Sequence, residues 1–375
     1  MVDTVKILLT IYDPRVLGGG AFAPISVEQL AVSYGTARTY LNPSPNYAKA
    51  GVCMPNLTLY RRPSKIGINY QLSVEFSAPK MLYGNNFDEI TEAEFDQLLT
   101  TLQSKLFELT GYRFPRGQLA QADIGSWHPC KNIVFLDYTS CQTIINTIGK
   151  LDISRVYDLQ RTNFRDGHVI HIHCNSLDIA FYDKLADLRK AKVSEKRAFE
   201  SSNAIQLQLL DPLQNMGAIE VLRQEVRFVG KASVKRAFPE LNAWTFEALF
   251  KKKQCQAALL KHWHRLTASI DMLSLDTSTP YELLQNYLIE NPDVTPQTAL
   301  AATAGLLING KEGVVSLRNL LDTRFGPQAW SRIKKIIKSP QANRYRHFDR
   351  VEEVLEDFTP TRLTKYLELI EITSK

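Results

Sequence analysis

The sequence of 375 residues has no long apolar run, and this absence excludes a membrane-spanning protein. A transmembrane helix needs about 18 or more consecutive apolar residues, and no segment approaches that length. The N-terminal stretch "MVDTVKILLTIYDP" is apolar for only a few residues, carries an early aspartate and lacks a small-residue cleavage site. It therefore predicts a first β-strand rather than a signal peptide. We expect a cytoplasmic protein with no membrane contact.

Cysteine is scarce and shows no paired spacing. The five cysteines are Cys53, Cys130, Cys141, Cys174 and Cys255. Their odd number and wide separation argue against a disulfide framework and against a zinc knuckle, so we expect reduced, ordinary residues. A strong excess of charge is also lacking, because the net charge of +6 is a moderate excess that permits a polyanionic partner without requiring one.

Alternation of apolar and polar residues recurs through the first 230 residues. The strand-like segments are "VKILLTIY", "INYQLSVEFS", "QLAQADIGSW", "HVIHIHCN", "LDIAFYDK" and "EVLRQEVRF". This pattern is typical of a sheet with one buried face. Helices are predicted in "ITEAEFDQLLTTLQSKLFELTG", where Thr91 and Glu94 form a capping box, in "YTSCQTIINTIGKL" and over residues 184–199. The sequence therefore predicts an α+β fold, with an antiparallel sheet and helices on one face.

The strand pattern fades from about Phe238, and nearly all of the following sequence has helical periodicity. Proline, glycine and cap-like threonine residues punctuate these segments. We therefore expect two domains: an α+β domain over residues 1–240 and an all-helical domain over residues 241–375.

Tyr182 lies where the strand-like segment gives way to a basic helix. Residues two apart in a strand share a face. One face of this segment should therefore carry Asp178, Ala180, Tyr182 and Lys184. The apolar residues between them should point towards the core.

The preceding strand places His171 and His173 on one face. If residues 175–176 form a two-residue hairpin loop, His173 lies opposite Asp178 and His171 lies opposite Ala180. Both histidines would then share the face of Tyr182. A loop of another length would reverse this arrangement.

Acidic and basic residues occupy the polar positions of other strands. By alternation, Glu75 and Asp123 oppose apolar neighbours, and Arg223, Glu225 and Arg227 share one face of their strand. If these strands form one sheet, its open face could hold a divalent cation and a phosphate.

These segments resemble, in order along the chain, the gene II replication initiators of filamentous phages and their plasmid relatives. These proteins are rolling-circle endonucleases with a nicking-endonuclease fold. The segment "AFYDKLADL" is similar to the family's tyrosine strand, "SVEFSAPKMLYGNN" to its glutamate strand, and "LAQADIGSW" and "LRQEVRF" to two further motifs. The segment "GKEGVVSLRNLLDTRFGPQAWSRIKKII" is similar to its C-terminal helical region.

The resemblance implies roles for particular residues. Tyr182 would be the nucleophile and Lys184 its helper at the phosphate, while Asp123, Glu225 and Glu75 would bind the metal. Asp187 stands where the family usually has glutamate. The triplet of His171, Ile172 and His173 has no counterpart in the phage protein but is similar to the metal-binding signature of the wider nicking-enzyme superfamily. Whether carboxylates or histidines hold the metal stays open.

The chemistry explains these residue types. A tyrosine that attacks a phosphodiester must lose a proton with a pKa near 10, and the phosphate charge must be offset. Mg²⁺ or Mn²⁺ would polarise the phosphoryl oxygens, with carboxylates suited to both ions and imidazole accepted for manganese. A 5′-phosphotyrosine intermediate would store the cleaved ester, so the strand could later be rejoined.

A basic run follows the tyrosine and contains Arg189, Lys190 and Lys192. Such runs are usually solvated helix faces, but here the run could follow a DNA backbone, together with Arg223 and Arg227. These two arginines could equally form a surface salt-bridge ladder with Glu225.

The combined hypothesis is a rolling-circle replication initiator that acts on origin DNA, with a host replication helicase as a further partner. Two alternatives remain: a non-enzymatic DNA-binding protein, and a metal-dependent phosphodiesterase that uses water and does not need Tyr182.

Overall fold

The structure is a computed structural model, and it describes most of the chain. Residues outside the description are 18–26, 28, 31, 33–36, 42, 44–45, 48–49, 65–66, 137–138, 152–160, 166–167, 175, 188–218, 269–279, 281–282, 285–286, 289–290, 292, 338–345 and 363–375. The predicted basic helix continues into this group after residue 187, so Arg189, Lys190 and Lys192 lie outside the described residues.

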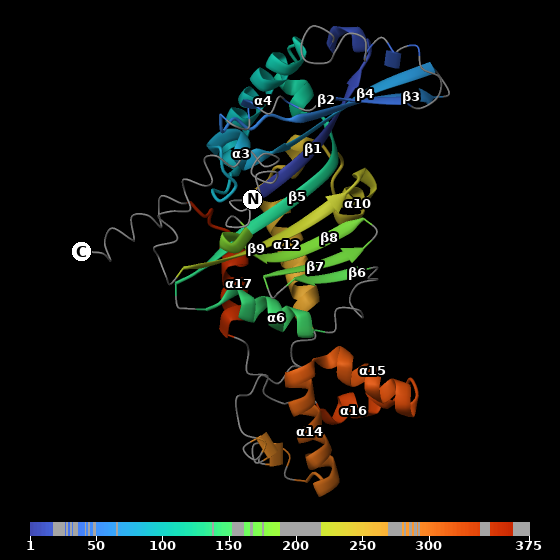
Figure 1. The fold of residues 1–375 in the computed structure, drawn as a ribbon, viewed down its shortest axis with the longest axis vertical. Helices are drawn as coiled ribbons and strands as arrows, with labels where there is room; N and C mark the ends of the chain where they lie inside the picture. Colours follow the sequence, from blue (N-terminus) through green and yellow to red (C-terminus); the bar gives the residue numbers. More distant parts are fainter. Residues whose placement is uncertain are drawn as a thin grey trace, which may run out of the picture.

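The described strands form one antiparallel sheet of nine strands in the order β2-β3-β4-β1-β5-β9-β8-β7-β6 (Figure 1). The strands are β1 (Val2–Ile11), β2 (Ala37–Leu41), β3 (Asn56–Ser64), β4 (Gly67–Ser77), β5 (Asp123–Phe135), β6 (Arg161–Arg165), β7 (Val169–Cys174), β8 (Leu177–Asp183) and β9 (Glu220–Val229). With the helices below, the predicted α+β class and antiparallel sheet are confirmed.

Helices are distributed along the whole described chain. They are η1 (Pro14–Leu17), α3 (Ala78–Tyr83), η2 (Glu92–Glu94), α4 (Phe95–Thr110), α5 (Arg116–Ala120), α6 (Cys141–Lys150), α10 (Lys231–Ala237), α11 (Phe246–Leu249), α12 (Lys252–Thr267), α14 (Pro296–Glu312), α15 (Val314–Phe325), α16 (Ala329–Ile337) and α17 (Arg346–Asp357). The predicted capping box is present, because the Thr91 backbone donates to the Glu94 carboxylate at 2.8 Å. None of the described helices combines the length and apolarity that crossing a bilayer requires.

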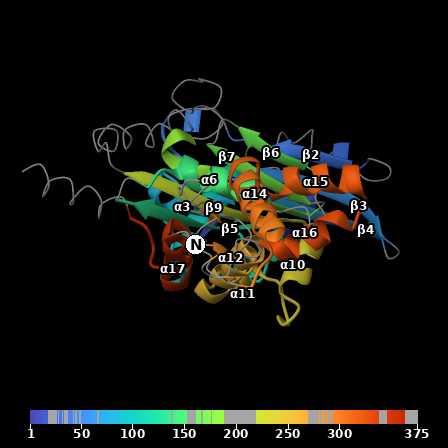
Figure 2. The same cartoon turned by 90° about the horizontal axis from the view of Figure 1, so that it is seen from below.

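One face of the sheet is covered by helices. Figure 2 shows α10, α11, α12 and α17 on the same side of the strands. Aromatic side chains fill this layer: Phe181 of β8 lies 6.0 Å from Trp263 of α12, and Phe228 of β9 lies 5.7 Å from Trp127 of β5, both between ring centroids. The alternation in β8 and β9 therefore directs Phe181, Val226 and Phe228 to the helices, together with the polar Gln224, and Tyr182, Glu225 and Arg227 to the opposite face.

The helical segment after residue 240 is divided between two locations. α11, α12 and α17 pack against the sheet, and Trp263 of α12 contacts Phe348 of α17. α14, α15 and α16 pack on one another below the sheet in Figure 1. Lys150 of α6 donates to the Gly310 carbonyl of α14 at 2.8 Å. The described part of residues 241–375 is thus mostly helical, and α11, α12 and α17 complete the core on one face of the sheet.

The hairpin formed by β7 and β8 has the register that the two-residue loop predicts. His173 pairs with Asp178, and His171 pairs with Ala180. β8 in turn pairs with β9, so that Ala180 lies opposite Glu225 and Tyr182 lies opposite Arg223. Both histidines and the tyrosine therefore share one face, as expected.

Alternation did not predict strands β2, β3 and β6. β2 and β6 are the edge strands of the sheet, where polar residues such as those in "ARTYL" and "RTNFR" are tolerated. β3 ends in "RRPS", a composition that gives little apolar periodicity. Pairing with neighbouring strands, rather than local pattern, decides these elements.

Candidate metal and tyrosine site

Tyr182 is held on the polar face by an acidic partner from the next strand. Its hydroxyl donates to Glu225 Oε2 at 3.2 Å. Ala180 lies beside Glu225 in the register and carries only a methyl group. The small side chain leaves Glu225 within reach of the tyrosine two residues further along β8.

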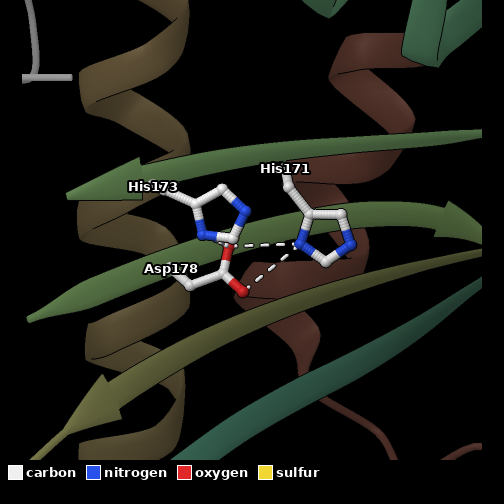
Figure 3. Close-up of side chains that lie close together, drawn as sticks. All are labelled: His171, His173 and Asp178. Atoms are coloured by element: carbon white, nitrogen blue, oxygen red, sulfur yellow. Dashed lines mark hydrogen bonds and ion pairs between the residues drawn. The ribbon is translucent and has the colours of Figure 1, made fainter. Parts of the chain in front are cut away.

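Two histidines and an aspartate form a compact cluster on the same face. His171 Nδ1 lies 3.2 Å from Asp178 Oδ1, and His173 Nδ1 lies 3.3 Å from the same oxygen. The two imidazole rings are stacked, with centroids 5.3 Å apart. Figure 3 shows all three side chains on the near side of the strands, with α12 and α17 behind the sheet.

The donor set of this cluster fits a divalent metal ion. One ligand atom from each residue lies within 4.8 Å of the others. Ligands at bonds of about 2.1 Å are separated by roughly 3 to 3.5 Å in tetrahedral or octahedral shells, which matches both distances from Asp178 Oδ1 to the imidazole nitrogens. Two imidazoles with one carboxylate suit Mn²⁺, Fe²⁺ or Zn²⁺ better than Mg²⁺.

Arg227 connects this cluster to the tyrosine. Its NH1 atom donates to Asp178 Oδ2 at 3.2 Å, and its Nε and NH2 atoms donate to the two oxygens of Glu225 at 2.9 and 3.1 Å. Asp178 Oδ1 is thereby left to face the histidines. Burial opposes ionisation of Asp178, but the hydrogen bond from His171 and the charge of Arg227 outweigh it and lower its pKa. A carboxylate that stays ionised is the form that binds a metal.

His128 is a further member of this site that the sequence pattern does not predict. His128 Nδ1 lies 3.5 Å from Glu225 Oε1, and its Nε2 lies 2.9 Å from Ser126 Oγ. Register shifts interrupt the pairing of β1 with β5, so simple alternation does not assign the face of His128. Burial opposes ionisation of Glu225, but His128 and Arg227 together lower its pKa. The alternation assigned Asp178 to the correct face but did not predict it as a metal ligand.

The Tyr182 hydroxyl lies in a strongly desolvated position. The residue is 9% exposed. Burial raises its pKa well above 10, and Glu225 and Asp187 raise it further, while Arg223 lowers it. The phenol is therefore protonated in this state, and deprotonation would need additional positive charge nearby.

Arg223 and Lys184 are on the predicted face but are buried, each with 1% exposure. Arg223 donates to Asn132 Oδ1 at 2.7 Å and to the Asn86 carbonyl. In this conformation, the Arg223 side chain is too buried to contact DNA. This finding corrects the DNA-contact role predicted for it. Arg227 is partly exposed and remains available for that role.

Lys184 carries a perturbed amine beside the tyrosine. Its Nζ lies 5.9 Å from the centre of the Tyr182 ring and 3.5 Å from Asp187 Oδ2. Burial and the charge of Arg223 lower its pKa to about 8, although Asp187 opposes this. Lys184 can therefore exchange a proton close to neutral pH, unlike an ordinary lysine.

Replacing Lys184 with methionine should change how stability depends on pH. Because the pKa of Lys184 is about 8 in the folded protein, against the ordinary lysine value of 10.5, the unfolded chain binds more protons between these limits. The charge on buried Lys184 therefore lowers the free energy of unfolding of the wild type by about 3 kcal/mol below pH 8. This loss of stability disappears as the pH rises towards 10.5. Urea unfolding at pH 7 to 10 should show Lys184→Met more stable at pH 7, with the difference shrinking at higher pH. A difference that does not vary with pH would show that this amine is not desolvated.

The structure does not bring Asp123 to the cluster. Asp123 begins β5, seven residues before Cys130, the residue that pairs with Glu225. At about 3.3 Å per residue, the two acids are roughly 20 Å apart along the sheet. Asp123 instead forms an ion pair with Lys231 at 2.5 Å. The expectation that Asp123 and Glu225 share one ion is therefore wrong.

Glu75 is also remote from the cluster. It lies on β4, three strand positions from β9, and strands are about 4.8 Å apart, which gives a separation of roughly 14 Å or more from Glu225. Its carboxylate pairs with Lys6 at 2.6 Å, and both side chains are exposed. The alternation identified its face correctly but not its position, and Glu75 is not a ligand of this cluster.

No protein-family model, curated protein or solved structure matches this chain.

Proposed function

We propose that this protein is a metal-dependent DNA nicking and joining enzyme of the rolling-circle initiator type, with Tyr182 as the nucleophile. The observation that carries the proposal is the shared face: a tyrosine hydroxyl bound to Glu225 is connected through Arg227 to a cluster of two histidines and an aspartate. A nucleophile, a metal-type cluster and a phosphate-binding guanidinium are the parts that phosphodiester transfer requires.

In the proposed reaction the Tyr182 oxygen attacks a DNA phosphorus atom. The bond from phosphorus to the 3′ oxygen breaks, and that oxygen leaves with the bonding electrons and becomes a free 3′-hydroxyl after protonation. The phenolic proton passes to Glu225, which accepts the hydrogen bond in the resting state. The phosphate stays joined to the 5′ side of the DNA and to Tyr182, and reversal of these steps rejoins the strand.

Arg227 has a double role in this proposal. In the resting state it neutralises Glu225 and Asp178. A DNA phosphate would compete for the same guanidinium, since arginine binds phosphate in a bidentate manner. Release of Glu225 from Arg227 would raise its pKa and make it a better proton acceptor for Tyr182. A divalent ion held by His171, His173 and Asp178 would supply positive charge to the scissile phosphate.

A second candidate function is a phosphodiesterase that uses water at the same metal cluster. The low exposure and raised pKa of Tyr182 favour this alternative, because a buried phenol is a poor nucleophile. The two reactions differ in one product, since only tyrosine attack joins the protein covalently to DNA.

We also propose that the helical segment helps to bind origin DNA. α16 buries Trp330 and exposes Arg332 and Lys335 to solvent. Exposed cations on one helix could contact phosphates without reading the base sequence. A host helicase would then act on the DNA that nicking opens.

The deciding experiment is incubation of the full chain with supercoiled DNA from its host element and Mn²⁺ or Mg²⁺. The products should be nicked circles and a protein–DNA adduct that survives denaturation, and peptide mapping should place the adduct on Tyr182. Nicked circles with no adduct would favour the water-using enzyme. Binding of the DNA without any nicking would favour a non-enzymatic DNA-binding protein.

A further inference from the structure

A second group of metal-ligating side chains lies where β8, β9 and α6 meet. Cys141 is the first residue of α6, Asp183 is the last residue of β8, and Glu220 is the first residue of β9. One ligand atom from each lies within 4.8 Å of the others. Asp183 has the same parity as Phe181, so this group is on the helix-covered face, opposite the histidine cluster.

Two of the three residues are buried, Glu220 is partly exposed, and the group has an excess of negative charge. Cys141 is fully buried, and Asp183 is nearly so. No ion pair joins a lysine or arginine to Asp183 or Glu220 within the part of the chain that the structure describes. Burial raises the pKa of the Cys141 thiol, and the charges of Asp183 and Glu220 raise it further. The thiol hydrogen-bonds to Glu220, and each carboxylate accepts one backbone N–H, Glu220 from Cys141 at 3.3 Å and Asp183 from Ala186 at 2.9 Å. These bonds do not neutralise the two negative charges, which a shared cation would.

His168 lies beside this group, and its side chain is 39% exposed. His168 Nδ1 lies 3.5 Å from Asp183 Oδ2, with geometry that makes no hydrogen bond. This nitrogen is buried and has no hydrogen-bond partner among the described residues. The His168 carbonyl accepts a bond from the Asp183 backbone at 3.0 Å, which keeps the histidine beside the group.

We propose that Cys141, Asp183 and Glu220 form a zinc site, with a water molecule as the fourth ligand. Zn²⁺ accepts thiolate, carboxylate and water together, usually in a tetrahedral shell. Binding would release the thiol proton and place a double positive charge among the two carboxylates. Mg²⁺ and Ca²⁺ prefer shells of oxygen ligands alone, so the thiol selects against them.

Zinc at this position would hold the tyrosine segment in place. Asp183 lies between Tyr182 and Lys184 in the chain, and the site would tie it to the start of α6 and to the start of β9. The role is structural, separate from the cluster of His171, His173 and Asp178, and it does not depend on the proposed nicking activity.

The test is Co²⁺ and Zn²⁺ binding to the full chain after removal of metal under reducing conditions. Co²⁺ should produce the near-ultraviolet charge-transfer band of a cobalt–thiolate bond, and Zn²⁺ should abolish this band by displacement. Cys141→Ala should lose the band, and Glu220→Gln should weaken Zn²⁺ binding by at least about tenfold, since loss even of indirect partners costs 10–100-fold.

Two matched variants serve as controls. Cys255→Ala removes another fully buried cysteine and should keep the band, as should His173→Ala, which alters only the other cluster. In a His173→Ala background, which weakens Zn²⁺ binding at the other cluster, Zn²⁺ should also raise the melting temperature, and it should do so with Cys255→Ala added but not with Glu220→Gln added. A band that persists in Cys141→Ala, or Zn²⁺ binding that is equal in wild type and Glu220→Gln, would overturn the proposal. Absence of a band in the wild type would overturn it as well.

Discussion

Tyr182→Phe should abolish the covalent protein–DNA adduct and reduce nicking by about 10⁴-fold or more, the scale on which loss of a covalent nucleophile acts. The ring remains to fill its buried position, and only the hydroxyl that donates to Glu225 is removed. Glu225 keeps His128 and Arg227 as partners, so the fold should lose about 1 kcal/mol or less. DNA affinity should stay nearly unchanged, because the phenol carries no charge in the resting state.

The matched control is Tyr60→Phe on β3, which removes a hydroxyl from another strand of the same sheet and should leave nicking at the wild-type rate. Adduct yield on a denaturing gel and the rate of nicked-circle formation measure both variants. Nicking by Tyr182→Phe at the wild-type rate would remove the tyrosine from the mechanism and leave the water-using reaction.

His173→Ala should weaken Mn²⁺ binding by about 100-fold or more, since it removes one of three direct ligands. Asp178→Asn should have an effect of similar size, because it also removes the charge that both histidines and Arg227 face. Neither substitution alters the hydrogen bond between Tyr182 and Glu225, which should persist in both variants. Titration of Mn²⁺ into each variant, with nicking and direct binding as readouts, gives the midpoints.

His264→Ala is the control for histidine removal, because His264 lies on α12 and is exposed beside Glu352. Its midpoint should equal that of the wild type. Equal midpoints for His173→Ala and the wild type would show that the triplet of His171, Ile172 and His173 resembles the superfamily signature by coincidence.

Local pattern determined which residues lie on which face. Alternation in β7, β8 and β9 assigned His171, His173, Tyr182 and Glu225 to one side of the sheet, and the register of the hairpin followed from the length of its loop. These features depend on a few consecutive residues, so they can be read without tertiary information. The capping box before α4 is local in the same way.

Distance within the sheet was decided only by the tertiary structure. Asp123 and Glu75 have the predicted parity, yet strand order and register place each of them far from Glu225. A period of two residues specifies a face but carries no information about which strands become neighbours or how far along them two residues lie. For that reason the alternation could not separate true neighbours from residues that only share a face.

The burial of the charged side chains and their interaction partners likewise could not be predicted from the sequence. Arg223 and Lys184 alternate as surface residues would, but Arg223 is enclosed by Asn86 and Asn132, which are distant in the chain, and Lys184 is buried beside Tyr182. Cys141 was expected to be an ordinary residue because the cysteines are scattered without paired spacing. The sequence does not reveal that Asp183 and Glu220, more than forty residues away, lie beside it. The sequence by itself thus determined the class of fold, the hairpin register and the polar face of Tyr182. Long-range packing decided which charges meet, because desolvation and ion pairing depend on contacts between segments that no local pattern records.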